Sequence, residues 1–199
     1  MKIIEGEQRT TRWYEARKAR PTASAFDKII TTKGEPSKSA KKYMYQLAGE
    51  FVSGVTLESF QSEAMTRGIE LEAEAREFYE LTHSVEVRQV AFCLTDNNLS
   101  GCSPDGLVGE DGMIEIKCPL VQTHVEYMLN NKLPTAYFQQ VQGQLWVTDR
   151  KWCDFISYYP GLKPLIVRVV RDEVFITLLE NEIEKFCIEL KNIIKKIGE

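Results

Sequence analysis

The stretch GCSPDGLVGEDGMIEIKCP, at residues 101–119, constrains the fold of this chain most strongly. Successive side chains of a β-strand point to opposite faces, so Glu115 and Lys117 share one face while the isoleucines beside them point towards a core. An Asp-Gly pair at residues 111–112 favours a hairpin turn that folds the preceding strand back on this one. Asp105 is then expected beside the end of the second strand, next to Glu115 and Lys117.

Two carboxylates and an ammonium therefore converge at one end of the predicted hairpin. Hard carboxylate oxygens suit Mg²⁺ or Mn²⁺. The alternative is a surface hairpin with an ordinary salt bridge, and Glu-Ile-Lys alone favours that alternative. The Ser-Pro-Asp-Gly segment at residues 103–106, together with the intervening turn, favours the metal site instead.

Composition limits the class of protein. The net charge of −4 hides a basic front, because residues 1–50 hold 11 Lys+Arg against 6 Asp+Glu. Such a front suits a DNA-contacting face. The five cysteines are widely spaced without a CxxC pair, which argues against a disulfide framework or a zinc or iron–sulfur site and fits a reducing, cytoplasmic setting. We expect no membrane partner and no signal peptide, because no apolar run is long enough to span a bilayer and the first residues contain no apolar h-region.

Apolar periodicity predicts the order of the elements. Helices are expected at residues 11–18, 22–30, 37–52, 62–83, 121–130, 134–146 and 172–197. Besides the hairpin, strands are expected at residues 85–94, 99–102, 152–159 and 165–170. This order predicts an α/β (mixed α+β) fold in which helices flank a central mixed sheet.

Several motifs occur together in a fixed order across residues 13–148. They are Arg17…Thr22-Ala23-Ser24, Gly68-x-x-x-Glu72-x-x-Ala75-Arg76, Ser103-Pro104-Asp105-Gly106, Glu115-Ile116-Lys117-Cys118-Pro119 and Gln140-Val141-Gln142…Trp146-Val147-Thr148. In this order they resemble the phage lambda exonuclease (YqaJ-like) type of viral recombinase nuclease, within the PD-(D/E)xK superfamily, whose core is restriction-endonuclease-like. The resemblance implies one nuclease domain over residues 1–199, with a helical DNA-contacting front (1–60), a catalytic core (61–171) and a closing helix (172–199).

The resemblance also implies an activity and partners. Such enzymes digest linear duplex DNA with Mg²⁺ and without ATP, removing the 5′-ended strand and leaving a 3′ overhang for recombination by strand annealing. They form ring-shaped homotrimers and work with a single-strand-annealing protein. The implied setting is the cytoplasm of a bacterial host, with a phage or prophage origin.

Matching positions give the expected metal site. Asp105, Glu115 and the backbone carbonyl of Ile116 match the family's metal ligands, and Glu72 matches a helical carboxylate that joins them. Lys117 matches the motif lysine, which either deprotonates the attacking water or, as an ammonium, stabilises developing charge. The sequence leaves both roles open.

Other matching positions are expected to contact DNA. Those matching the family's pocket for the terminal 5′-phosphate are Arg17, Ser24, Ser103 and Gln140. An arginine fork with hydroxyl and amide donors suits a phosphate dianion. Met65 aligns with an apolar wedge that splits the duplex end, and Lys33 is expected near the downstream duplex. Taken alone, Ser24 reads as a helix cap, Gln140 as a solvated helix face and Met65 as a core residue.

The chain also departs from the family pattern. Thr123 stands about where the family carries a basic residue, and we expect His124 and His83 at the surface. Two other functions compete with the exonuclease: a structure-specific or restriction-type endonuclease on the same core, and a non-catalytic DNA-end-binding module. Retention of both acids and the lysine speaks against the non-catalytic module.

Overall fold

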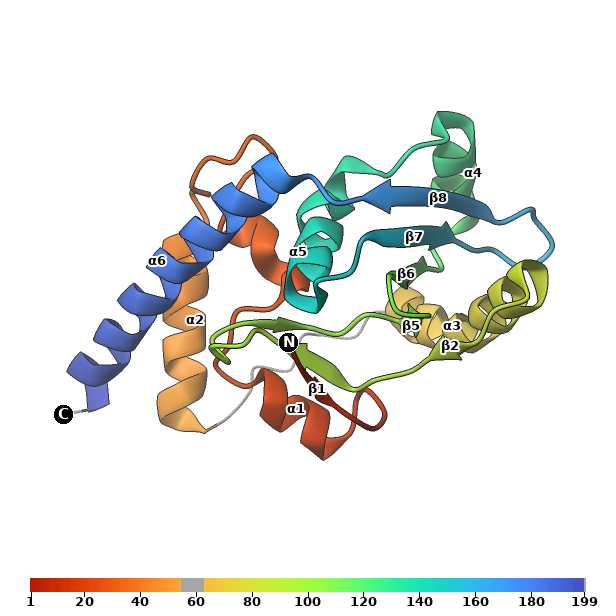
Figure 1. The fold of residues 1–199 in the computed structure, drawn as a ribbon. Helices are drawn as coiled ribbons and strands as arrows, with labels where there is room; N and C mark the ends of the chain where they lie inside the picture. Colours follow the sequence, from red (N-terminus) through yellow and green to blue (C-terminus); the bar gives the residue numbers. More distant parts are fainter. Residues whose placement is uncertain (55–62, 199) are drawn as a thin grey trace.

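The computed structural model describes residues 1–54 and 63–198, with side chains described for residues 1–54 and 66–198. Within these ranges the strands form two sheets (Figure 1). The larger sheet has the order β2-β5-β6-β7-β8, with the bounds Val87–Arg88, Gly106–Val108, Gly112–Lys117, Trp152–Ser157 and Leu165–Val170. β6 and β7 are parallel and the other neighbours are antiparallel. The smaller sheet has the order β1-β3-β4, with the bounds Lys2–Ile4, Phe92–Leu94 and Gly101–Cys102.

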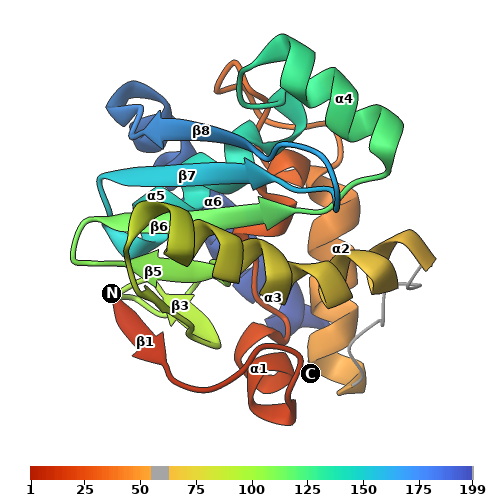
Figure 2. The same cartoon turned by 90° about the vertical axis from the view of Figure 1, so that its right-hand side faces the viewer.

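Helices flank the larger sheet on both faces, so the predicted fold class is confirmed. α3 (Glu63–His83) crosses one face, as Figure 2 shows, and α5 (Phe138–Thr148) covers the other. Beyond α5, α2 (Ala40–Ser53) and α6 (Glu173–Gly198) pack along each other. The remaining helical segments are α1 (Thr11–Arg17), η1 (Ala23–Lys28), α4 (Val121–Asn130) and η2 (Thr135–Tyr137). In the described part of the chain, no helix is long and apolar enough to span a membrane.

Strand β6 joins the two cores because its side chains alternate between the faces. Ile114 and Ile116 pack in the apolar cluster that includes Tyr79 of α3. Met113 packs in the other cluster, with Leu145 of α5. Glu115 and Lys117 fall on the same side of the strand as Met113. The pattern therefore directs a carboxylate into the interface between the sheet and α5.

The hairpin prediction is confirmed, but the turn uses a different glycine. Residues 109–111 connect β5 to β6, and Gly109 takes the positive φ of 52°. Gly112, predicted in the turn, already lies in β6 opposite Val108. There a Cβ would overlap the Trp152 ring, so this glycine serves close packing.

Three other expectations differ from the structure in detail. The predicted strand 85–94 is interrupted: β2 joins the large sheet, whereas β3 joins the small one, where it pairs with the unpredicted strand β1. The predicted helix 22–30 is a 3₁₀ helix, η1. The helix predicted from Pro134 starts with the 3₁₀ turn η2 and becomes α-helical at Phe138. Gly143 of α5 lies against Phe26 of η1, and a Cβ there would overlap the Phe26 ring.

The expected surface position of His124 is wrong, because His124 is fully buried. Its Nε2 lies 3.2 Å from the carbonyl oxygen of Lys163 and donates to it. Its Nδ1 therefore accepts from the Ser157 hydroxyl, 2.8 Å away. Burying an imidazole is tolerable when both nitrogens find partners, and this pair attaches α4 to the end of β7. His83 is exposed, as expected.

Candidate active site

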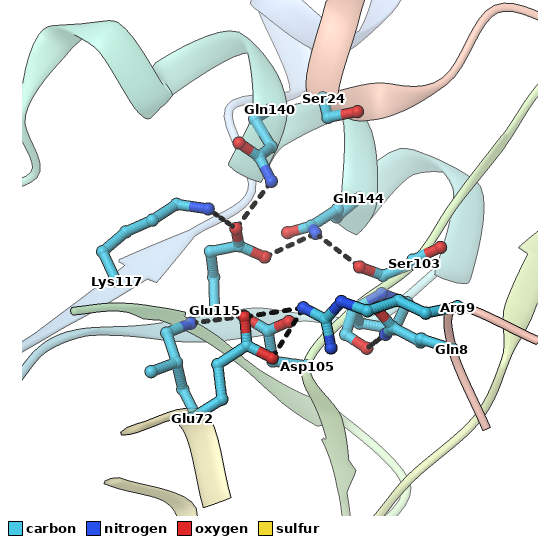
Figure 3. Close-up of polar contacts among 12 residues, drawn as sticks. Gln8, Arg9, Ser24, Glu72, Ser103, Asp105, Glu115, Lys117, Gln140 and Gln144 are labelled. Atoms are coloured by element: carbon cyan, nitrogen blue, oxygen red, sulfur yellow. Dashed lines mark hydrogen bonds and ion pairs between the residues drawn. The ribbon is translucent and has the colours of Figure 1, made fainter. Parts of the chain in front are cut away.

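The hairpin places Asp105 against the last residues of β6. Its backbone N–H donates to the carbonyl of Ile114 at 3.2 Å. Its Oδ2 accepts from the backbone N–H of Ile116 at 2.6 Å. The backbone and the side chain of Asp105 are thus both fixed by the neighbouring strand, and the carboxylate stays beside the C-terminal end of β6 (Figure 3).

Glu115 is buried and accepts hydrogen bonds from three side chains. Its Oε1 accepts from Lys117 Nζ at 2.5 Å and from Gln140 Nε2 at 2.6 Å. Its Oε2 accepts from Gln144 Nε2 at 2.7 Å (Figure 3). Gln140 and Gln144 are one helical turn apart on α5, so both face the strand. A buried carboxylate requires such donors, and here they also fix its orientation.

The surroundings of Asp105 raise the cost of ionising its carboxyl group. Burial, followed by the negative charges of Glu115 and Glu72, raises the pKa of Asp105 well above its usual range, although Lys117 opposes the rise. Burial alone would lower the pKa of Lys117, but the charges of Glu115 and Asp105 outweigh burial and raise it. The cluster thus has more concentrated negative charge than one lysine neutralises, and it favours a bound cation.

Glu72 approaches Asp105 from α3 and is paired with Arg9. Arg9 Nη2 lies 2.9 Å from both carboxylate oxygens of Glu72. The side chains of Arg9 and Glu72 are 37% and 21% exposed, so this pair faces solvent more than Glu115 does. Figure 3 shows Glu72 below Asp105, with Arg9 extending from the opposite side.

A second cluster lies where α1, η1 and the segment after β4 meet. Arg17 Nη1 donates to Ser103 Oγ at 3.2 Å, and Nη2 lies 3.5 Å from Ser24 Oγ. Trp13 Nε1 donates to the same Ser103 hydroxyl at 2.8 Å, and the Arg17 guanidinium stacks 4.3 Å above the Trp13 ring. Burial lowers the pKa of Arg17, and among the groups that act in the opposite direction Tyr43 contributes most. Ser24 does not cap η1, since the cap position is Thr22.

The predicted site residues are thus partly brought together. Gln140 is predicted to line the phosphate pocket, and in the structure its side chain donates to Glu115 of the carboxylate group. Lys33 is exposed on the loop after η1, where the adjacent Gly34 packs on Leu178 of α6, and no contact in the described residues joins Lys33 to either cluster. Met65 lies in α3, but its side chain is outside the described part of the chain.

The donor set fits a divalent cation by its chemistry. Carboxylates and a strand-end carbonyl are the hard oxygen ligands that Mg²⁺ and Mn²⁺ take. In the described residues, no three Asp, Glu, His or Cys side chains lie close enough together to form a ready metal cage. Two of these carboxylates are already paired with cationic side chains, Glu72 with Arg9 and Glu115 with Lys117.

Sequence reasoning missed Gln144 and Arg9. The signal for Gln144 was present, because it follows Gln140 by four residues on a predicted helix. Its Nε2 also lies 3.4 Å from the carbonyl of Ser103, so one amide bridges the two clusters. Arg9 carried no signal, because its position depends on a backbone conformation with φ of 65° that is unusual for arginine.

Comparison with solved structures defines the class. The fold matches an alkaline exonuclease (LHK-Exo) from Laribacter hongkongensis at 34% identity and a TM-score of 0.86, covering 95% of this chain and 96% of that one. The same exonuclease in complex with dAMP matches at 35% identity and a TM-score of 0.86, with 94% and 96% covered. A phage related exonuclease from Haemophilus somnus 129PT shares the fold at 16% identity and a TM-score of 0.69, covering 89% and 96%. These similarities place the chain in the class of exonuclease-type nucleases.

The sequence narrows this class to a family. Residues 12–151 match the YqaJ-like viral recombinase domain. The chain therefore belongs to the YqaJ-like viral recombinase family, as the motifs predicted. No curated protein sequence matches it.

Proposed function

We propose that this protein is a Mg²⁺-dependent, ATP-independent 5′→3′ exonuclease that degrades one strand of linear duplex DNA and leaves a 3′ overhang. The observation that carries the proposal is that Asp105, Glu115 and Lys117 are held at the end of β6, with Glu72 near enough to act on the charge of Asp105, beside the Arg17 cluster. Carboxylates that can hold a cation thereby lie next to donors that can hold a phosphate. Membership of the recombinase family and the likeness to exonucleases support this assignment.

In the proposed reaction, each residue acts from the position already described. A bound divalent cation would neutralise the scissile phosphate and lower the pKa of its water. Asp105, Glu115, Glu72 and the carbonyl of Ile116 hold that cation. Lys117 acts on the attacking water, as a base or as an ammonium that stabilises developing charge. Gln140 and Gln144 keep the Glu115 carboxylate oriented.

The Arg17 cluster supplies recognition of the DNA end. A guanidinium with two hydroxyl neighbours, Ser24 and Ser103, offers several donors to a terminal 5′-phosphate. Gln140 joins this pocket from α5. Lys33 contacts the downstream duplex and Met65 separates the strands at its end. Selecting the 5′-phosphate would bias digestion in one direction.

The proposed assembly follows the same family. The chain is one nuclease domain, with a front at residues 1–60, a core at 61–171 and a closing helix at 172–199. Three copies form a ring around DNA, and a single-strand-annealing protein takes the 3′ overhang. The proposed location is the cytoplasm of a bacterial host.

Digestion of linear duplex DNA, labelled separately at each 5′ and 3′ end, tests the activity. With Mg²⁺ and no ATP, we expect nucleotides to be released from the 5′-ended strand while the 3′-ended strand persists, and a chelator should stop the release. Nicking of closed circular DNA would support the endonuclease instead. Binding of DNA ends without any cleavage would support the non-catalytic module.

A further inference from the structure

Arg9 has a conformation that its residue type disfavours. Its φ of 65° lies in the left-handed region, where a Cβ crowds the following carbonyl. Strained residues of this kind persist when the surrounding structure holds them, and they cluster at functional sites. Here the strained backbone directs the guanidinium at Glu72, with Nη2 2.9 Å from both carboxylate oxygens (Figure 3).

The neighbours of Arg9 fasten this loop to the protein. Gln8 Nε2 donates to the carbonyl of Pro104 at 2.9 Å, next to Asp105. Thr10 Oγ1 donates to the carbonyl of Glu7 at 2.9 Å and caps α1 by accepting from Trp13 N–H at 3.4 Å. The loop is therefore anchored on both sides of Arg9, and the pairing with Glu72 is a built feature of the fold.

The pairing occupies the oxygens that a cation would need. Arg9 contacts both oxygens of Glu72, the carboxylate that α3 contributes to the cluster around Asp105. An arginine and a divalent cation cannot both hold the same two oxygens in full. Because both side chains are partly exposed, water screens the pair and keeps it weak enough to exchange.

We propose that Arg9 is a positioning residue that holds Glu72 and competes with the divalent cation for it, thereby setting the cation affinity of the site. Glu72 joins Asp105 and Glu115 around a cation only when Arg9 releases it. The inference rests on the place of Glu72 in the cation site of the proposed function.

Binding of Mn²⁺ to the full-length protein without DNA tests this competition, with free Mn²⁺ followed by its EPR signal. Arg9→Gly removes the guanidinium and suits the backbone, since glycine adopts a positive φ freely. We expect about threefold tighter Mn²⁺ binding, the size of effect typical of an exposed ion pair. Arg9→Lys, which keeps the charge but not the planar fork, should lie between Arg9→Gly and wild type.

A matched control separates competition from the loss of positive charge. Arg88 on β2 forms an exposed ion pair with Glu5, so Arg88→Gln removes one exposed, paired arginine without removing a partner of Glu72. Its Mn²⁺ affinity should stay within about 1.5-fold of wild type. Equal tightening in Arg88→Gln and Arg9→Gly would overturn the proposal.

A double-mutant cycle gives the sharpest result. In a Glu72→Gln background, Arg9→Gly should change Mn²⁺ affinity by less than about 1.5-fold, because the contested carboxylate is gone. An undiminished effect in that background would overturn the inference while leaving the exonuclease proposal intact. If the wild type cleaves DNA with Mg²⁺ but Arg9→Gly leaves its Mn²⁺ affinity unchanged, the inference fails alone. A wild type that neither binds Mn²⁺ nor cleaves DNA overturns both.

Discussion

Glu115 and Glu72 reach the same cluster from opposite faces of the sheet, but they are held differently. The side chain of Glu115 is 2% exposed and has three internal donors, whereas that of Glu72 is 21% exposed and pairs with Arg9 from a distant loop. We call the first region, with Asp105, Glu115 and Lys117, the hairpin side. The second, with Arg9, Arg17, Glu72 and Ser24, is the arginine side. From this difference we predict that the hairpin side is rigid and that the pairing of Glu72 with Arg9 changes more readily when a ligand binds.

The strongest test of this contrast is Asp105→Asn on the hairpin side. We expect the rate of nucleotide release from linear duplex DNA to fall about a thousandfold, because a rigid anionic ligand contributes several kcal/mol to the charge balance of the reaction. An unchanged melting temperature would show that the fold is intact. A rate within tenfold of wild type would remove Asp105 from the site.

Glu72→Gln should cost less, because Glu72 already shares its carboxylate with Arg9. The expected loss of rate is about 10- to 100-fold. Raising the Mg²⁺ concentration should recover part of it, as a titration of rate against Mg²⁺ would show. A loss as deep as that of Asp105→Asn, without recovery, would mean that the two sides are equally rigid.

Arg17→Ala probes end recognition on the arginine side. A hydrogen bond to a charged group is worth about 1.5–3 kcal/mol, so digestion of 5′-phosphorylated ends should slow by at least about tenfold. Digestion of 5′-hydroxyl ends should change much less. Parallel time courses on the two substrates measure the ratio, and equal slowing would exclude a 5′-phosphate pocket at Arg17.

Two buried glutamines of α5 offer a matched pair. Gln144 bridges Glu115 and the Ser103 carbonyl, whereas Gln142 bonds the carbonyl of Val170 and the N–H of Asp172, away from the site. We expect Gln144→Leu to lower the rate about fivefold by loosening the hairpin side. Gln142→Leu should instead lower the free energy of unfolding by about 1–3 kcal/mol and leave the rate per folded molecule unchanged.

Denaturant unfolding and the cleavage assay together separate the two effects. If both variants lose only stability, the bridging amide of Gln144 has no part in catalysis. If Gln142→Leu also loses rate per folded molecule, the two positions on α5 do not differ in the way that their contacts indicate.

The smallest expected effect is a pH dependence of stability that arises from Tyr43, a buried neighbour of Arg17. Burial raises the pKa of Tyr43 to about 12, so the fold favours the neutral phenol. A raised pKa means that this stability is fully present below the ordinary pKa of about 10 and is lost as pH rises towards 12. Between pH 9 and 11, Tyr43→Phe should therefore lose about 1 kcal/mol less free energy of unfolding than wild type. Equal losses in urea titrations at both pH values would refute this.

The sequence predicted the parts of the molecule that depend on local patterns. Alternation in β6 was readable because apolar and polar residues strictly alternate from Ile114 to Lys117, and the resulting hairpin and fold class are confirmed. The helical stripes of α3 and α6 were readable for the same reason, to within a residue or two.

What escaped prediction depends on tertiary contacts. β1 has only three residues and forms because β3 offers it an edge, which no local pattern encodes. His124 is buried because Ser157 and Lys163, far along the chain, satisfy its ring. The contact of Arg9 with Glu72 could not be predicted because it depends on a strained backbone angle.

Gly143 touches neither candidate cluster, yet its bare Cα lets η1 settle against α5. Ser24 belongs to η1 and Gln140 belongs to α5. The distance between these two residues, which are proposed to bind a DNA end, therefore depends on the absence of a side chain at Gly143. One extra methyl at this contact would widen that gap. A substitution at Gly143 would therefore change the preference for DNA ends without changing any residue proposed to contact DNA.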